Sequence, residues 1–119
     1  MKVFNIDDLF ASYSEHVGEY VCVEGYYDGK NIKNNNLEEA LIVDDNKHFH
    51  STLTQLLKKI GLSSYVGGIR VIGKLGVGMT NRANIGQIIK VEILNDDGKF
   101  QKSAMINSDS IPKDIRDQI

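Results

Sequence analysis

Two periods of hydrophobic residues follow one another in the first part of the chain. Apolar side chains recur at helical spacing near the N-terminus and predict a short helix over residues 6–15, with Asn5 as its N-cap. From Tyr20 the period changes to two, which predicts a strand that runs to Tyr27. Gly25 interrupts this strand, and an interior glycine is typical of a bend or a bulge.

The middle of the chain predicts a loop, two strands and a second helix. Residues 28–36 are polar and rich in turn formers, so we expect a connection there. Residues 37–45 predict a second strand, and residues 47–51 a short third one. Residues 52–60 carry an apolar stripe at helical spacing and predict the second helix.

The last strands follow this helix. Apolar and polar residues alternate over 67–77 and again over 85–94, which predicts two half-buried strands. Residues 95–99 form a turn of hairpin type, so residues 99–106 are expected to return as an edge strand.

The first of these strands nearly matches a phosphate-binding loop. Gly68, Gly73 and Lys74 stand at the required spacing, but Leu75 replaces the hydroxyl residue that would contact magnesium. The residues between the glycines are mostly β-branched and suit a paired strand. We therefore predict a strand whose glycines mark bends or close backbone approaches, and not a nucleotide site.

The order of these elements predicts a mainly β protein with two helices. The stretches YSEHVGEYVCVEGYY, YVGGIRVIGKL and IIKVEIL resemble the OB-fold superfamily, in particular small bacterial OB domains similar to the anticodon-binding OB family. That resemblance implies a five-stranded Greek-key barrel with an N-terminal helix and a helix between strands three and four. The domain would span residues 1–106, and residues 107–119 would form a tail with a short helical turn. Another small α+β meander is the alternative, because element order alone does not fix strand pairing.

The OB resemblance also implies where a ligand would bind. OB domains use the face of strands two and three and the loops that join strands one to two and four to five. Here these loops are residues 28–36 and 78–84. The residues implied on or near them are Tyr26, Tyr27, Lys30, Lys33, Asn34, Asn35, Asn36, Phe49, Asn81, Arg82 and Asn84.

Composition bears on the number of domains, the class of partner and the cellular compartment of the protein. The chain has 119 residues, of which 41% are hydrophobic, and this suits one globular domain. The net charge of -2 gives no overall basic field that would attract nucleic acid. The single cysteine, Cys22, suits a reducing compartment. No leader and no membrane span is evident, so we expect a cytoplasmic protein without a membrane partner.

We expect no catalytic residue, no cofactor and no metal. No nucleophile stands with an activating base in a recognisable motif. His48 and His50 would share one face of the predicted third strand and can chelate a metal with Asp44 or Asp45. Two histidines do not complete a site, however, so contact with a partner is the favoured role for them.

Two functions remain, and both are non-catalytic. The leading hypothesis is recognition of a protein partner, in which Glu38, Glu39, Asp44 and Asp45 would steer a basic protein. In size and charge the chain is similar to the small acidic immunity and antitoxin proteins of bacteria, which cover a basic nuclease. The alternative is single-stranded nucleic-acid binding, in which bases would stack on aromatic rings and a local basic rim would hold phosphates. The rings would be Tyr26, Tyr27 and Phe49, and the cations Lys30, Lys33, Lys74 and Arg82.

Overall fold

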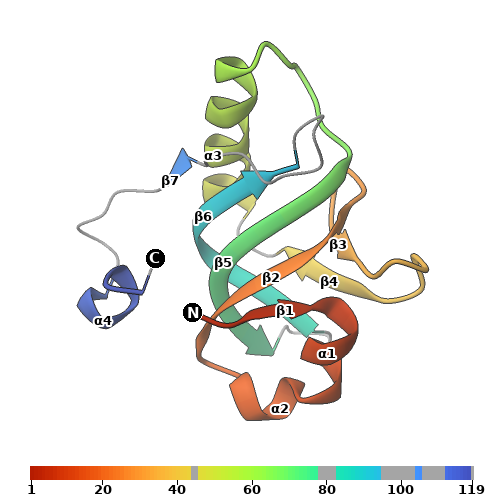
Figure 1. The fold of residues 1–119 in the computed structure, drawn as a ribbon, viewed down its shortest axis with the longest axis vertical. Coiled ribbons are helices and arrows are strands. Elements are labelled where there is room, and N and C mark those ends of the chain that lie inside the picture. Colours follow the sequence, from red (N-terminus) through yellow and green to blue (C-terminus); the bar gives the residue numbers. More distant parts are fainter. Residues whose placement is uncertain (44–45, 78–82, 95–103, 106–111, 119) are drawn as a thin grey trace.

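The computed structural model describes residues 1–43, 46–77, 83–94, 104–105 and 112–118, and it is mainly β (Figure 1). One sheet contains the seven strands of the described residues: β1 (Val3–Asn5), β2 (Tyr20–Tyr27), β3 (Ile32–Lys33), β4 (Ala40–Val43), β5 (Gly67–Val77), β6 (Ala83–Ile93) and β7 (Ala104–Met105). The helices of the described residues are α1 (Ile6–Ala11), α2 (Tyr13–His16), α3 (Asn46–Lys59) and α4 (Lys113–Arg116). The described part of the chain contains no helix long and apolar enough to cross a membrane.

The strand pairings form a closed cycle. β2 pairs with β3, β3 with β4, and β4 with β6 in parallel, while β6 pairs with β5 and β5 returns to β2. The β2–β5 contact is long and joins all eight residues of β2 to residues 67–74. β1 adds to β2 in parallel, and β7 adds to β6.

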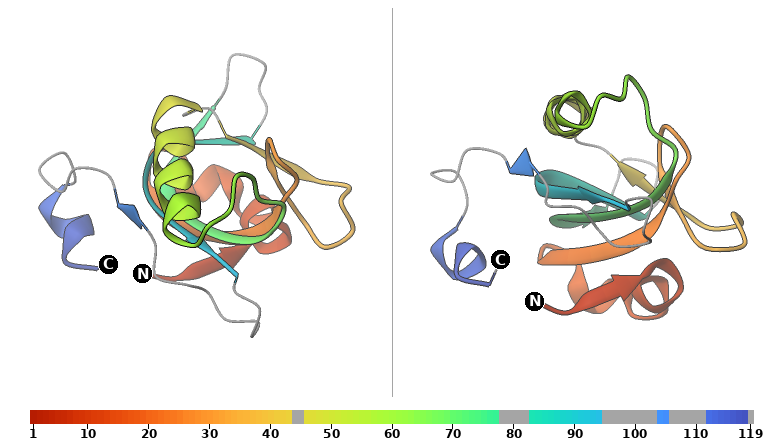
Figure 2. Two further views of the ribbon diagram at one scale, coloured as in Figure 1. Left: turned by 90° about the horizontal axis from the view of Figure 1, so that it is seen from above. Right: turned by 45° about the horizontal axis from the view of Figure 1, so that its top comes forward.

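The core lies inside this cycle, and helices lie at its two ends. α3 covers one end and contributes Phe49 and Leu53, whereas α1 and α2 lie at the other end, where Ile6 and Leu9 are buried (Figures 1 and 2). α1 begins as predicted, because the Asn5 side chain accepts a hydrogen bond from the Asp8 N–H at 2.7 Å.

Glycines occur where strands approach closely. A Cβ on Gly25 would lie 2.8 Å from the carbonyl oxygen of Lys33, and one on Gly73 would lie 2.7 Å from that of Gly86. Both distances are too short for any larger residue. The whole stretch from Gly68 to Lys74 lies in β5, so the strand interpretation of that glycine pattern is confirmed.

Two predictions in the middle of the chain are wrong. Residues 47–51 belong to α3 and not to a strand, because Phe49 stands four residues before Leu53 and extends the apolar stripe of the helix by one turn. The loop predicted over residues 28–36 contains β3, so the hairpin partner of β4 begins at Ile32.

The helices also differ from the expected two. The N-terminal helix is divided at Ser12 into α1 and α2. At the other end of the chain, Ile115 of α4 packs on the outer face of the sheet against a small buried cluster of Cys22, Ile72 and Ile89. Residues 95–103 of the predicted turn and edge strand lie outside the described residues.

Candidate functional site

The three aromatic residues implied in ligand contact lie in different environments. Tyr27 is 3% exposed and Phe49 is 1% exposed, and their rings meet in the core with centroids 5.4 Å apart. Tyr26 points the other way along the strand and is 37% exposed. Of these three rings, Tyr26 alone is available at the surface for stacking.

The two implied lysines flank a tight turn that Asp28 organises. Asp28 Oδ1 accepts hydrogen bonds from the N–H groups of Lys30 and Asn31 at 2.9 and 2.8 Å, and Oδ2 lies 3.1 Å from Lys33 Nζ. Partial burial opposes ionisation of this carboxyl, but these hydrogen bonds and the lysine charge outweigh it and lower the pKa of Asp28. The charge of Lys33 is therefore already paired within the protein.

Asn34 fixes the loop that joins β3 to β4. Its side chain is buried, and Oδ1 accepts hydrogen bonds from the N–H groups of Glu38 and Glu39 at 3.0 and 3.2 Å. Its Nδ2 donates to Asp7 Oδ1 at 3.0 Å, which ties the loop to α1. A single amide thus holds both the shape of the loop and its position on the protein.

The same loop presents an exposed leucine in a strained conformation. Leu37 is 52% exposed and has a φ of 61°, a backbone region that favours glycine and asparagine. Its N–H donates to the Asn34 carbonyl at 3.0 Å, so the turn is closed by a hydrogen bond. The sequence pattern placed Leu37 at the start of a strand, because leucine carries no turn signal.

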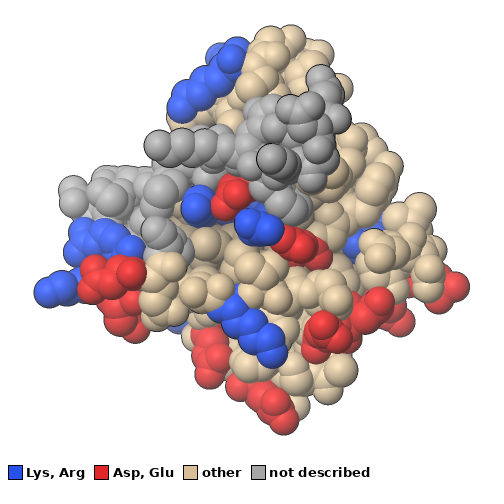
Figure 3. All heavy atoms as spheres, viewed as in Figure 1, with Lys and Arg blue, Asp and Glu red and all other residues tan. Residues whose placement is uncertain are grey.

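Two acidic residues lie next to this leucine. Glu38 and Glu39 follow it directly and are both exposed. In Figure 3 acidic side chains gather on the side of the molecule where the β3–β4 hairpin projects. We call Leu37, Glu38 and Glu39 the hairpin tip; it is an apolar residue within an acidic surround.

The remaining implied residues do not gather into one site. His50 is exposed on α3, and position 48 belongs to the same helix and not to a strand. The shared strand face expected for His48 and His50 is therefore wrong. Among the described residues no group of three His, Cys, Asp or Glu side chains stands close enough to hold a metal ion. Asp44, Asp45, Asn81 and Arg82 lie outside the described residues.

Asn84 belongs to the framework of the fold. It is 6% exposed and lies in β6, and its N–H donates to the Tyr13 hydroxyl oxygen at 3.0 Å. The Tyr13 hydroxyl in turn donates to the Gly76 carbonyl. These contacts join the helical end of the molecule to the β5–β6 pair.

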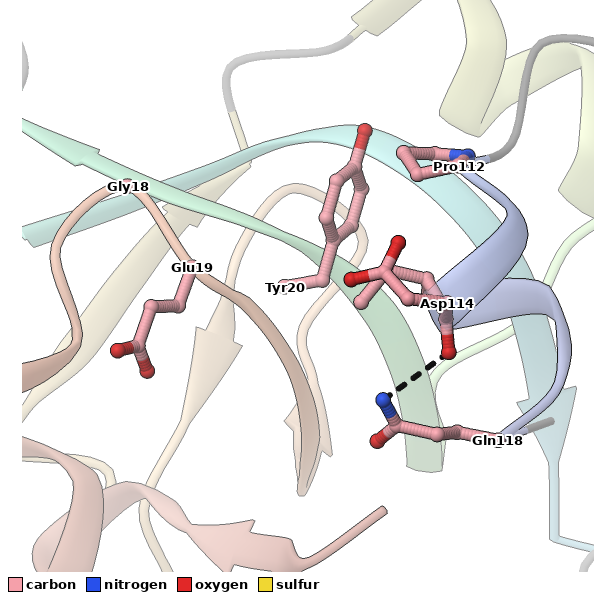
Figure 4. Close-up of a pocket in the computed structure, with 7 residues that line it drawn as sticks. Gly18, Glu19, Tyr20, Pro112, Asp114 and Gln118 are labelled. Carbon is pink, nitrogen blue, oxygen red and sulfur yellow. Dashed lines mark hydrogen bonds between the residues drawn. The ribbon is translucent and has the colours of Figure 1, made fainter.

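One cavity of about 400 Å³ lies between the start of β2 and α4 (Figure 4). Its lining includes Tyr20, Asp114 and Gln118, and the Tyr20 hydroxyl donates to Gln87 Oε1 at 3.1 Å. Glu19 also lines it, but Figure 4 shows its side chain pointing away from α4. The two carboxylates do not converge, and the tyrosine hydroxyl already has a partner.

A second cavity of about 260 Å³ lies beside α3 and close to the turn after β2. We call it the α3 cavity. Its lining residues are Tyr27, Gly29, His50, Leu53, Thr54, Leu57, Ser63, Ser64, Tyr65 and Val66. Its lining combines apolar side chains with hydroxyl groups, which is the usual composition of a small ligand site.

Comparisons of the chain with protein-family models, with curated proteins and with solved structures found no match. The geometry of the hairpin tip and of the two cavities is therefore the basis for a functional proposal.

Proposed function

We propose that the protein is a non-catalytic OB-like barrel that binds a protein partner through its hairpin tip. The barrel part of this proposal rests on the cyclic order of pairings, β2-β3-β4-β6-β5, with the β4–β6 pair parallel. Along the chain, the long helix α3 lies between β4 and β5, which are the third and fourth of these five strands in sequence order. An OB barrel has a helix at this place and five strands in a Greek-key arrangement.

The conformation of Leu37 carries the binding part of the proposal. A left-handed backbone costs a residue other than glycine roughly 1–2 kcal/mol. Strain of this kind is concentrated at functional positions, where a side chain is held in place for contact. Here the strain projects an apolar side chain into solvent, and the buried Asn34 amide keeps the loop in that shape. A partner's apolar pocket would cover the Leu37 side chain and remove it from water.

The charge of the hairpin tip favours a basic partner. Glu38 and Glu39 lie beside Leu37, and complementary charges at the rim of an interface speed association and orient the two proteins. An inhibitor of a basic enzyme would have this arrangement of an apolar anchor within acidic residues. We propose this inhibitory role as the specific form of the function.

Single-stranded nucleic acid is the second candidate, and the contacts of the implied residues favour it less. Stacking requires exposed rings with cations nearby. Tyr27 and Phe49 are core residues, and Lys33 is paired with Asp28. Of the implied rings and cations, Tyr26 and Lys30 are exposed and Lys74 is half-buried, while Arg82 lies outside the described residues.

Site-specific crosslinking tests the proposal. A photoreactive benzoylphenylalanine would replace Leu37, or Leu62 as a control, since Leu62 is 46% exposed and has no left-handed backbone. In extract of the source organism, we expect the probe at position 37 to form one dominant adduct, with a basic protein. Excess wild-type protein should compete with the adduct, and excess Leu37→Asn protein should not. Leu62→Asn protein should compete as well as wild type.

Two results would contradict protein recognition by the hairpin tip. One is an adduct pattern that is the same for positions 37 and 62, or that Leu37→Asn protein suppresses as fully as wild type. The other is sub-micromolar binding of labelled single-stranded DNA or RNA that weakens steeply with salt. The second result would establish the nucleic-acid alternative.

A further inference from the structure

A buried tyrosine in the lining of the α3 cavity, Tyr27, has no hydrogen-bond partner for its hydroxyl among the described residues. Tyr27 lines this cavity and is 3% exposed, and the structure gives its hydroxyl no hydrogen bond within the described part of the chain. The other tyrosine in the lining differs, because the Tyr65 hydroxyl donates to the Gly68 carbonyl at 2.7 Å. Buried polar groups in proteins are nearly always paired, so an unpaired one at a cavity wall points to a missing ligand.

The Tyr27 hydroxyl is available as a hydrogen-bond donor. Burial of the side chain, together with the charge of the neighbouring Asp28, raises the pKa of Tyr27 above its ordinary value. The group therefore keeps its proton at physiological pH. A ligand atom that pairs with it must accept a hydrogen bond.

The size and lining of the α3 cavity define the rest of the ligand. Leu53, Leu57 and Val66 provide apolar surface, while Thr54 and Ser64 add hydroxyl groups. A closed apolar cavity of about 150 Å³ is large enough to hold benzene. The volume of about 260 Å³ therefore suits one aromatic ring with a small substituent.

We propose that the α3 cavity binds a small molecule made of one aromatic ring and one hydrogen-bond acceptor, with the acceptor at the Tyr27 hydroxyl. This site is separate from the hairpin tip, since none of the tip residues lines the cavity. The proposal of a small-molecule site in the α3 cavity is therefore independent of the proposal that the hairpin tip binds a protein.

Acetophenone and isopropylbenzene are suitable probes, because they have the same number of non-hydrogen atoms and only acetophenone carries a carbonyl acceptor. Each is titrated into the full-length, ¹⁵N-labelled protein, and binding is followed by amide chemical shifts. We expect acetophenone to shift the amides of Gly29, Thr54 and Ser64, with a dissociation constant on the order of 1 mM or tighter for so small a ligand. Isopropylbenzene should bind at least several-fold more weakly.

Two pairs of variants locate the contact. Tyr27→Phe should weaken acetophenone about tenfold, the effect of one hydrogen bond, and leave isopropylbenzene unchanged. Tyr20→Phe makes the same change at a tyrosine outside the α3 cavity and should alter neither compound. Thr54→Phe fills the cavity mouth and should abolish binding of both, whereas Gln55→Phe, at the next exposed position on α3, should not.

The proposal is overturned if acetophenone shifts none of the cavity amides up to its solubility limit. It is also overturned if Tyr27→Phe binds acetophenone as tightly as wild type, or if Thr54→Phe retains binding. Equal affinity for the two compounds would remove the role of the Tyr27 hydroxyl.

Discussion

Replacement of Asn34 should loosen the hairpin that carries Leu37. Asn34→Ala removes two hydrogen bonds to backbone N–H groups and one to the Asp7 carboxylate. A neutral hydrogen bond contributes about 1 kcal/mol and one to a charged group somewhat more, so the free energy of unfolding should fall by about 3 kcal/mol. For a domain of this length, that loss lowers Tm by about 10 °C. Asn36→Ala, at an exposed position of the same loop, should leave stability within about 0.5 kcal/mol of wild type.

A charge-exchange cycle separates the contact with Asp7 from the contacts within the loop. Asn34→Asp keeps an acceptor for the two N–H groups but sets a second carboxylate against Asp7. The repulsion raises the pKa of one carboxyl in the folded state above its value in the unfolded chain. The deficit relative to wild type is therefore complete at neutral pH and shrinks as the pH falls through the raised pKa. Combining Asn34→Asp with Asp7→Asn again places a carboxylate opposite an amide, and should recover at least half of the loss.

Urea unfolding followed by circular dichroism measures these effects, and amide hydrogen exchange at Glu38 and Glu39 locates them. Exchange at both amides should accelerate in Asn34→Ala and stay slow in the combined variant. The account of the loop fails if Asn34→Ala is as stable as wild type. The account of the Asp7 contact fails if the combined variant is no more stable than Asn34→Asp alone.

Two further predictions concern the strands. Gly73→Ala should lower the free energy of unfolding by more than about 2 kcal/mol, because its Cβ would lie 2.7 Å from the Gly86 carbonyl oxygen. Gly76→Ala should cost less, because its Cβ would meet the Asn84 side chain and not backbone. Equal losses of stability in chemical denaturation would contradict this prediction. Burial raises the pKa of the Cys22 thiol from 9.0 to about 11, so the folded state favours the neutral thiol. Stability should therefore be complete below pH 9 and fall by roughly 2–3 kcal/mol as the pH rises from 9.0 to about 11. The denaturation midpoint of wild type should fall relative to that of Cys22→Ala over this range, and parallel curves would refute the assignment.

The parts of the fold that depend on regular periodicity were predictable from the sequence. β2, β5 and β6 each carry several alternating residues, and they lie where the pattern predicted them. β3 was missed because two residues, Ile32 and Lys33, are too few to show a period and lie in a run of turn formers. The first turn of α3 was assigned to a strand because KHFHS alternates over a short window, while the spacing that places Phe49 on the helix appears over a longer one.

The candidate sites were less predictable than the fold. The OB resemblance implied that Tyr27 and Phe49 would contact a ligand from the surface of the sheet, but alternation along a strand does not say which face is inside. The resemblance implied Asn34 only as one residue of a ligand loop, because a run of three asparagines indicates no more than a turn. Its contact with the backbone beside Leu37, and the exposure of Leu37 itself, depend on the loop conformation and were not predicted. The α3 cavity is lined by residues from three separate segments of the chain, and a local sequence pattern does not predict that these segments lie side by side.

The cyclic pairing of strands also sets the order in which the protein can fold. The β5–β6 pair joins neighbouring segments and can form early. The β2–β5 pair must first bring together residues that lie 40 (Tyr27 and Gly67) to 54 (Tyr20 and Lys74) positions apart, which costs loop entropy. The β4–β6 contact consists of two residue pairs, Ile42 with Asn84 and Val43 with Ile85. So short a β4–β6 pairing contributes little stability until the β3–β4 and β5–β6 pairs have formed. We therefore expect the β4–β6 pairing to form last during folding and to open first. The β3–β4 hairpin that carries Leu37 is joined to the rest of the cycle at this β4–β6 pairing.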